Sequence, residues 1–229
     1  DKKIDITLKN LTFSYTKDKI TLKDISFSIK SGEKVAIIGA SGSGKTTISQ
    51  LIAGFYAKNS GDILYNDISI DNISKKSLRE HLFLVLQMPI LFNNTLRFNL
   101  TMGENISNEK IKEALKIAQL NSMLENLPDG LDTVVGKMGI RLSGGQRQRL
   151  SIARMILANP SVVIFDESTS ALDVQTETKL FENLENILKD KTVITIAHRL
   201  STVKNASKIF VLEDGELVQS GTHLELEDK

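Results

Sequence analysis

The stretch that decides the fold is Gly39-Ala40-Ser41-Gly42-Ser43-Gly44-Lys45-Thr46. A short apolar run, residues 34–38, comes directly before it and is typical of a buried strand. After it, apolar residues recur at helical spacing, namely Ile48, Leu51, Ile52 and Phe55. The sequence therefore predicts a strand, a glycine-rich loop and a helix in succession.

This loop has the residue types that bind phosphate. Gly39, Gly42 and Gly44 allow the backbone to turn so that successive N–H groups point inward, at the positive end of the following helix. Lys45 is expected to neutralise β and γ oxygens of a nucleoside triphosphate, and the Thr46 hydroxyl is expected to bind Mg²⁺. A loop that serves only packing is disfavoured, because the whole GxxxxGK[ST] pattern occurs between a strand and a helix.

Two carboxylates end another buried run. Residues 162–165 are apolar and are followed by Asp166 and Glu167, which places both acids at the carboxyl edge of a sheet. Asp166 is predicted to hold Mg²⁺, and Glu167 to orient or deprotonate a water that attacks the γ-phosphate. His198 follows a third run, residues 193–197, and is predicted to reach the same edge and bond the γ-phosphate.

The composition limits the classes of function. The chain has 229 residues, 29 Lys+Arg against 28 Asp+Glu, and 41% hydrophobic residues, which suits one large α/β domain. The near-zero charge gives no bulk attraction for nucleic acid, and the absence of cysteine excludes disulfides and thiolate chemistry. No apolar run approaches the roughly 20 residues of a membrane span. We expect a soluble fragment of a longer protein, because the sequence begins at Asp1 without a leader.

Strand patterns occupy both ends of the chain. Residues 4–8, 11–15 and 25–29 alternate apolar and polar side chains, as half-buried antiparallel strands do. Residues 208–212 and 216–219 flank an Asp-Gly pair and predict a hairpin.

Between about residues 87 and 159 the strand patterns almost vanish. Ser107 is a plausible N-cap for a helix with one apolar face, formed by Ile111, Ala114, Leu115 and Ala118. A later helix has its own apolar face, formed by Leu180, Phe181, Leu184, Ile187 and Leu188. We therefore predict a helical insertion in an alternating strand and helix chain.

A second helix start has free N–H groups. Leu142-Ser143-Gly144-Gly145-Gln146 directly precedes a helix that ends near Asn159-Pro160. Taken alone, the segment is better explained as an N-cap serine followed by a turn. As an anion site it would be surplus, because the first loop already holds the phosphates.

The pentapeptide resembles the signature motif of ATP-binding-cassette (ABC) ATPases, and the resemblance covers nearly the whole chain. Tyr15 matches the A-loop aromatic that stacks on adenine, Gln87 the Q-loop glutamine, residues 170–173 the D-loop, and His198 the switch histidine. The segments 127–133, 147–149 and 221–223 have the order and spacing of the exporter branch.

The resemblance implies a fold and its divisions. It is the P-loop NTPase fold of the α/β class, with a RecA-like parallel sheet core, an antiparallel β subdomain and an α-helical subdomain. Residues 1–229 would form one nucleotide-binding domain, in which 1–86 and 160–229 form the ATP-binding core and 87–159 the helical signature subdomain.

The resemblance also implies the site. The cofactors would be ATP and Mg²⁺, and the catalytic residues Glu167, His198, Lys45 and Gln87. The metal would be held by Thr46, Gln87 and Asp166, and the D-loop at the dimer contact would be Ser170, Ala171, Leu172 and Asp173. ATP would be bound by Tyr15, Gly39, Ala40, Ser41, Gly42, Ser43, Gly44, Lys45, Thr46, Thr47, Ser143, Gly144, Gly145 and Gln146.

The implied function is ATP hydrolysis that powers export across a membrane. Two ATP molecules would join two nucleotide-binding domains head to tail, and a transmembrane domain would be fused on the N-terminal side. The domain would lie on the cytoplasmic face of a membrane, most simply the bacterial inner membrane, and no nucleic acid partner is expected. Peptide, lipid, drug and glycolipid all stay open as substrates, as do a homodimer, a heterodimer and a preceding peptidase-like domain.

Two alternatives come from other classes. A soluble cassette ATPase acting on nucleic acid or ribosomes would account for the clustered arginines near the signature, but the chain has no long heptad coiled coil and its net charge is near zero. A nucleotide-binding regulator with a dead site would need a missing catalytic group, and none is missing. Val134 and Lys137 stand where exporters usually carry acids, in a segment thought to contact the membrane domain, and Ser168 replaces a more usual alanine.

Overall fold

The computed structural model describes residues 3–167, 170–197 and 206–227. The chain divides into two compact units, which we describe separately. The sheet unit comprises residues 1–84, 160–167 and 190–229, and the helical unit comprises residues 85–159 and 168–189. The domain limits given above stay a prediction; in this division, residues 168–189 group with the helical unit.

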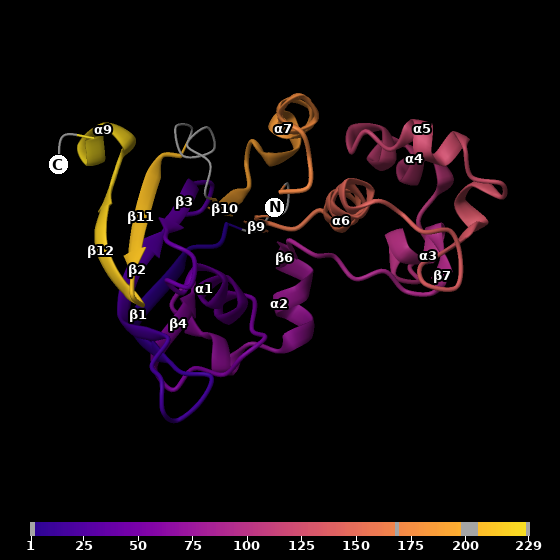
Figure 1. The fold of residues 1–229 in the computed structure, drawn as a ribbon. Coiled ribbons are helices and arrows are strands. Elements are labelled where there is room, and N and C mark those ends of the chain that lie inside the picture. Colours follow the sequence, from indigo (N-terminus) through magenta and orange to yellow (C-terminus); the bar gives the residue numbers. More distant parts are fainter. Residues whose placement is uncertain (1–2, 168–169, 198–205, 228–229) are drawn as a thin grey trace. The chain divides into compact units, whose positions relative to one another are not determined.

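The sheet unit contains a six-stranded sheet in the order β12-β11-β3-β10-β9-β6 (Figure 1). β3 pairs in parallel with β10 and β11, and β10 pairs in parallel with β9. β11 and β12 pair antiparallel, and Asp214 and Gly215 between them have φ of 47° and 81°, as a tight hairpin requires. The strands are β3 (Lys34–Gly39), β6 (Leu82–Val85), β9 (Val162–Asp166), β10 (Thr192–Ile196), β11 (Lys208–Glu213) and β12 (Glu216–Gly221).

A second, antiparallel sheet has the order β2-β1-β4-β5, formed by β1 (Ile6–Phe13), β2 (Leu22–Ile29), β4 (Ser60–Tyr65) and β5 (Ile68–Ser69). The expected separate strands 4–8 and 11–15 are one strand, β1, with a register shift between Leu8 and Leu11. Asn10 lies in that irregularity with φ 46°, so the apolar alternation changes phase without a break in the strand. Both sheets contribute side chains to one apolar core.

Helix α1 (Lys45–Ile52) follows the glycine-rich loop and buries Ile48, Leu51 and Ile52 completely in that core. The expectation that Phe55 continues its apolar face was wrong. Gly54 has φ 73°, which ends the helix, and Phe55 is 55% exposed. The other helical segments in the described part of this unit are η1 (Ile70–Asn72), α2 (Lys75–His81) and α9 (His223–Glu227).

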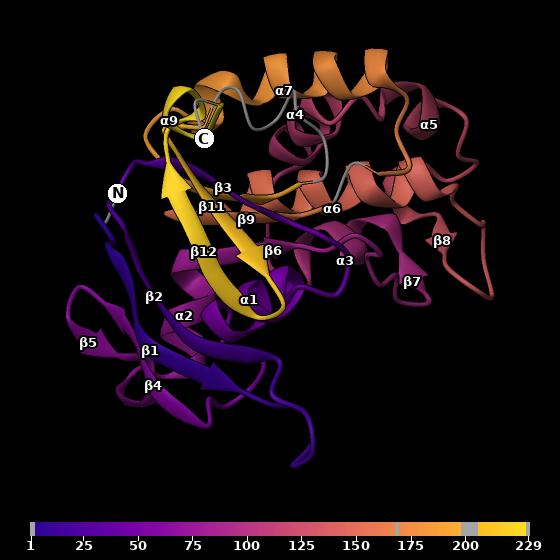
Figure 2. The same ribbon diagram turned by 60° about the vertical axis from the view of Figure 1, so that its left-hand side comes forward.

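The helical unit has its own core, and α4 contacts both α6 and α7 (Figure 2). Ser107 caps α4 through its Oγ, which accepts the Lys110 N–H at 3.4 Å. In the part of the chain that the structure describes, no helix combines the length and apolar character of a membrane span. The elements are β7 (Asn94–Thr95), α3 (Leu96–Thr101), α4 (Asn108–Ile117), α5 (Asn121–Glu125), η2 (Gly130–Asp132), β8 (Val134–Val135), α6 (Gly144–Ala158) and α7 (Val174–Leu188).

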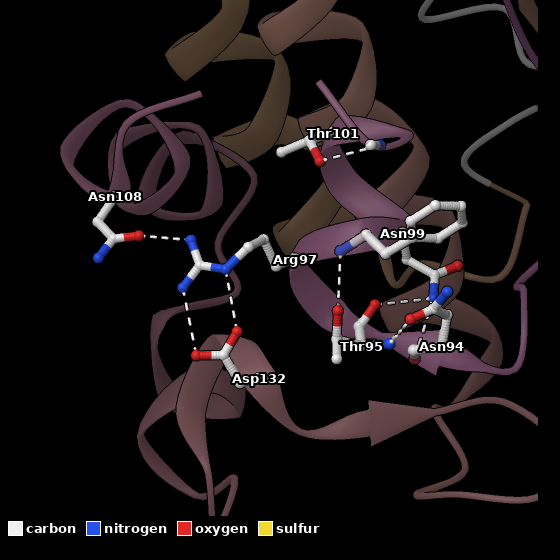
Figure 3. Close-up of polar contacts among 9 residues, drawn as sticks. Asn94, Thr95, Arg97, Asn99, Thr101, Asn108 and Asp132 are labelled. Atoms are coloured by element: carbon white, nitrogen blue, oxygen red, sulfur yellow. Dashed lines mark hydrogen bonds and ion pairs between the residues drawn. The ribbon is translucent and has the colours of Figure 1, made fainter. Parts of the chain in front are cut away.

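Polar contacts hold the segment around α3. Arg97 donates from Nε to Asp132 Oδ1 at 3.0 Å and also bonds Asn108, which joins α3 to η2 and α4 (Figure 3). Asn99 is completely buried; its Oδ1 accepts from Phe92 N at 2.9 Å, and its Nδ2 donates to the carbonyls of Phe92, Asn94 and Thr95. The loop before α3 is therefore shaped by one buried amide.

The predicted class is confirmed: a parallel α/β sheet with an antiparallel sheet and a set of helices. The sequence patterns missed β4, where Ile63, Leu64 and Tyr65 are buried in succession and so show no alternation. They also missed the short pair β7–β8, in a segment expected to lack strands.

Candidate active site

The glycine-rich loop leaves the carboxyl end of β3, which lies between β10 and β11. Gly39, Gly42 and Gly44 have φ of 156°, 81° and 105°. A Cβ at Gly39 would lie 2.3 Å from Leu212 O, and one at Gly44 would lie 2.5 Å from Leu22 Cδ2. Gly39 and Gly44 are therefore required both by the backbone turn and by the close approach of neighbouring strands, and Gly42 by the turn alone.

The loop has an exposed rim and a buried floor. Ala40, Ser41 and Gly42 are exposed, whereas Ser43, Gly44 and Lys45 are buried. The Lys45 ammonium donates to Gly39 O at 2.8 Å and Ala40 O at 2.9 Å. Burial lowers the pKa of Lys45, and the charges of Glu167 and Asp166 oppose that shift. A cation is thus held inside the curve of the loop.

The floor of the loop fits an anion. Ser43 Oγ is buried and has no hydrogen-bond partner in the described chain, and Gly44 precedes α1 without any side-chain cap. Uncapped N–H groups at a helix start, a spare hydroxyl and an ammonium form the donor set that binds phosphate oxygens.

Asp166, the last residue of β9, is bonded to two hydroxyls of α1. Thr46 Oγ1 donates to Asp166 Oδ1 at 3.2 Å, and Ser49 Oγ lies 3.3 Å from Asp166 Oδ2. Burial raises the pKa of Asp166, while the bonds from Thr46 and Ser49 lower it. Among the described residues no group of three or more His, Asp or Glu could enclose a metal ion. The neighbouring Thr46 and Asp166 oxygens are ligands of the kind that Mg²⁺ uses when it also binds phosphate and water.

Glu167 lies one residue beyond β9 in an unusual backbone conformation. Its φ is 46°, and its N–H donates to Ile196 O of β10 at 3.2 Å. A non-glycine residue in this region costs of order 1 kcal/mol and is typical of functional sites. The charge of Glu167 acts on both Lys45 and Asp166, which places its carboxylate in the electrostatic surroundings of the loop.

Two further predicted site residues, Tyr15 and His198, fall in the residue ranges of the sheet unit. Tyr15 lies two residues after β1, is 50% exposed, and bonds Thr47 of α1 through its hydroxyl at 3.0 Å. His198 lies outside the described residues. The sheet unit therefore brings together the loop, Thr47, Asp166, Glu167 and Tyr15.

The signature segment lies in the helical unit, at the start of α6. Ser143 Oγ accepts from Gln146 N at 3.1 Å, and Gln146 Oε1 accepts from Ser143 N at 2.8 Å, which is a capping box. A Cβ at Gly145 would lie 3.2 Å from Leu172 Cδ2. The signature glycines thus let residues 171–172 pack closely against the helix start.

Gln87 is exposed, and its carbonyl accepts from Gln148 Nε2 of α6 at 3.0 Å. The same Gln148 amide donates to Ser170 Oγ at 3.2 Å and accepts from Ala171 N at 3.0 Å. Asp173 caps α7 through Thr176 N at 2.9 Å. The helical unit therefore brings together Gln87, the signature and residues 170–173.

Sequence reasoning missed two of these residues. Ser49 and Gln148 are buried polar residues on the inner faces of helices, and Ser49 bonds a predicted metal ligand. A polar residue at an apolar position of the helical repeat was the available signal, since buried polar groups need partners.

Comparisons with known proteins agree with this geometry. Residues 22–170 match the family described as ABC transporter. The chain is 43% identical over 225 residues to the ATP-dependent lipid A-core flippase of Photobacterium profundum, covering 97% of this chain and 38% of that protein. A Staphylococcus aureus protein, provisionally named a multidrug export ATP-binding/permease protein, is 45% identical over 223 residues, which are 96% of this chain and 39% of that protein.

A solved structure titled as a bacterial Atm1-family ABC exporter with ATP bound superposes with a TM-score of 0.92 at 39% identity. The match covers 99% of this chain and 40% of that chain. The chain thus spans about two fifths of the length of the relatives it matches. With its phosphate loop, signature helix and mixed sheets, the chain is a nucleotide-binding ATPase domain of the ABC transporter family.

Proposed function

We propose that this chain hydrolyses ATP to drive export of a substrate, working as one of two domains that close head to tail around two nucleotides. The observation that carries the proposal is the donor set of the sheet unit, in which a buried lysine, a spare hydroxyl and the Thr46–Asp166 pair surround one loop. Bound Mg²⁺ would supply charge neutralisation for the phosphates. Thr46 and Asp166 would hold it, with Gln87 as a further ligand.

Each polar group then has a task. The loop residues 39–47 bind and orient the triphosphate, with the Lys45 ammonium beside the β and γ oxygens, and the Tyr15 ring stacks on the nucleotide base. Glu167 accepts a proton from the attacking water, and His198 bonds the γ-phosphate. In-line attack then breaks the bond between the γ-phosphorus and the bridging oxygen and yields ADP and phosphate.

The second helix start supports the head-to-tail dimer. The described residues include two glycine-rich helix starts, at α1 and at α6, and one triphosphate needs only one within the same chain. Ser143 and Gly145 of one copy would close over the nucleotide of the other. ATP binding then links the copies, and hydrolysis releases them.

An exposed apolar patch supports a transmembrane partner. It lies on two loops of the helical unit that are joined by β7–β8 and by the bond from Met138 N to Asn93 Oδ1 at 3.2 Å. Patches of this kind mark interaction sites. Its members are Met88, Ile90, Phe92, Val134, Met138 and Ile140. Docking there would place the domain on the cytoplasmic face of a membrane.

Glu167→Gln tests the proposal. The amide keeps the size of the side chain but accepts a proton poorly, so steady-state hydrolysis should fall by about 10²-fold or more while ATP still binds. Phosphate release and nucleotide affinity should be measured side by side, and size-exclusion chromatography with ATP should show an accumulated dimer. Glu185→Gln makes the same change at an exposed position of α7 and is the matched control.

Two outcomes would count against these roles. Unchanged hydrolysis in Glu167→Gln would remove Glu167 as the base. Ser143→Arg should abolish hydrolysis and dimer formation yet leave ATP binding to the monomer intact, so loss of that binding would contradict the role in trans.

A further inference from the structure

Three aromatic rings cluster beside the phosphate loop. The Tyr15 ring is perpendicular to two neighbours: its centroid lies 4.9 Å from Phe13 at 86° and 5.2 Å from Tyr56 at 90°. Phe13 is buried in the core, whereas Tyr15 and Tyr56 are 50% and 45% exposed. Edge-to-face contacts of this kind favour one orientation of each ring over others.

The Tyr15 hydroxyl is held as well. It donates to Gln50 Oε1 at 3.1 Å and lies 3.0 Å from Thr47 Oγ1. Because the phenol has one proton, which goes to Gln50, Thr47 is the donor in the second contact. Both partners lie on α1, the helix that begins at Lys45. The exposed ring is therefore fixed by its edge contacts and by its hydroxyl, relative to the helix that starts at the phosphate loop.

We propose that Gln50 and Tyr56 are positioning residues for the nucleotide base, which hold the Tyr15 ring in the plane that the base stacks on. This inference rests on the proposed binding of the base by Tyr15. A stacked base is bound well only if the ring is already oriented when the phosphates enter the loop, since a free ring would lose rotational freedom on binding. Gln50 acts through the hydroxyl of Tyr15, and Tyr56 acts through its ring.

The test compares ATP with inorganic triphosphate, which has the phosphates and no base. In the parent chain, calorimetry gives both dissociation constants and, from them, the ratio of ATP affinity to triphosphate affinity. Gln50→Leu removes the acceptor and should weaken ATP binding roughly three- to tenfold while triphosphate binding stays the same. Gln50→Glu keeps an acceptor oxygen, so the ratio of ATP affinity to triphosphate affinity should return toward the parent value. Tyr56→Leu should lower that ratio by a similar factor.

A double-mutant cycle links Gln50 to the hydroxyl. Tyr15→Phe should reproduce the effect of Gln50→Leu, and the double variant should be no weaker than either single one. Fully additive losses would overturn the inference. Equal weakening of ATP and triphosphate in Gln50→Leu would also overturn it, because the damage would then lie in the phosphate loop.

Tyr15→Leu separates this inference from the proposed function. If Tyr15→Leu leaves the ratio of ATP to triphosphate affinity unchanged, the base does not stack on Tyr15, and that part of the proposed function fails. If Tyr15→Leu lowers the ratio but the Gln50 and Tyr56 variants do not, only the positioning role fails.

Discussion

At the end of β9, the stability of the fold and the proposed chemistry place opposite demands on one side chain, Asp166. Asp166 is nearly completely buried, and its carboxylate receives hydrogen bonds from two hydroxyls of α1. Burial of a charge is costly without a counter-charge, and in this chain burial raises the pKa of Asp166. The folded chain therefore carries a costly buried carboxylate at the position proposed to hold Mg²⁺.

Asp166→Asn should consequently stabilise the nucleotide-free chain. Since the pKa of Asp166 is raised in the folded state, the folded chain binds its proton more tightly. Stability is lost as the pH rises through the interval between the ordinary and the raised pKa, and the loss is complete above it. The variant should melt a few degrees higher than the parent near neutral pH, and the gap should narrow as the pH falls toward about 4.

Thermal unfolding followed by circular dichroism across this pH range measures the effect. Asp129→Asn, at an exposed carboxylate, is the matched control. If the difference in melting temperature between Asp166→Asn and the parent stays constant with pH, the added stability comes from packing rather than from loss of the charge.

At the scale of elements, the loop before α3 depends on α3 and α6 for its shape. Arg154 of α6 donates from its guanidinium to Asn99 Oδ1 at 2.9 Å and to Ile90 O at 2.9 Å. Burial lowers the pKa of Arg154 to about 10, so the side chain stays charged at neutral pH. The exposed apolar patch is thereby tied to the helix that starts with the signature segment.

Asn99→Ala should cost roughly 2–4 kcal/mol of unfolding free energy, because it removes a completely buried amide and leaves backbone groups of residues 92, 94 and 95 and part of Arg154 without this partner. Urea denaturation measures the loss. Asn94→Ala is the control: Asn94 is exposed, its side chain accepts one bond from Thr95 N at 2.8 Å, and its loss should cost under about 1 kcal/mol. Equal losses in the two variants would contradict the central role of Asn99 (Figure 3).

For the whole molecule, the separate cores of the two units predict an uneven response to nucleotide. ATP with Mg²⁺ should protect amides of β3, α1 and β9 from hydrogen exchange more than those of α4 and α5. Binding at a hundred times the dissociation constant adds about 2.7 kcal/mol to the state that binds. The measurement should use Ser143→Arg to prevent dimers, with Lys45→Ala as the variant that loses the response. Equal protection of all these elements would contradict two units of separate stability.

Local patterns in the sequence were enough to predict the strand, the glycine-rich loop and the helix of the candidate site. The loop, its strand and its helix are neighbours along the chain, so glycine positions, the lysine and the hydroxyl predict their own arrangement. The same holds for the Ser143 cap and the hairpin at Asp214 and Gly215, where backbone conformation is decided within a few residues. The β1 bulge and the end of α1 before Phe55 were missed because they depend on single left-handed residues inside regular patterns.

Contacts between distant residues were decided by the tertiary structure alone. Ser49 meets Asp166 across 117 positions, Tyr15 meets Gln50 across 35, and Gln148 joins Gln87 to Ser170 across 61 and 22. In none of these pairs are the partners neighbours within one helical turn or on one pair of strands, so no local sequence pattern indicates the contact. The sequence by itself determined the chemistry of the loop and the family. Only the packing of helices and strands on the two cores decided which polar groups lie beside the loop and the signature segment, because a buried hydrogen bond needs both partners in place.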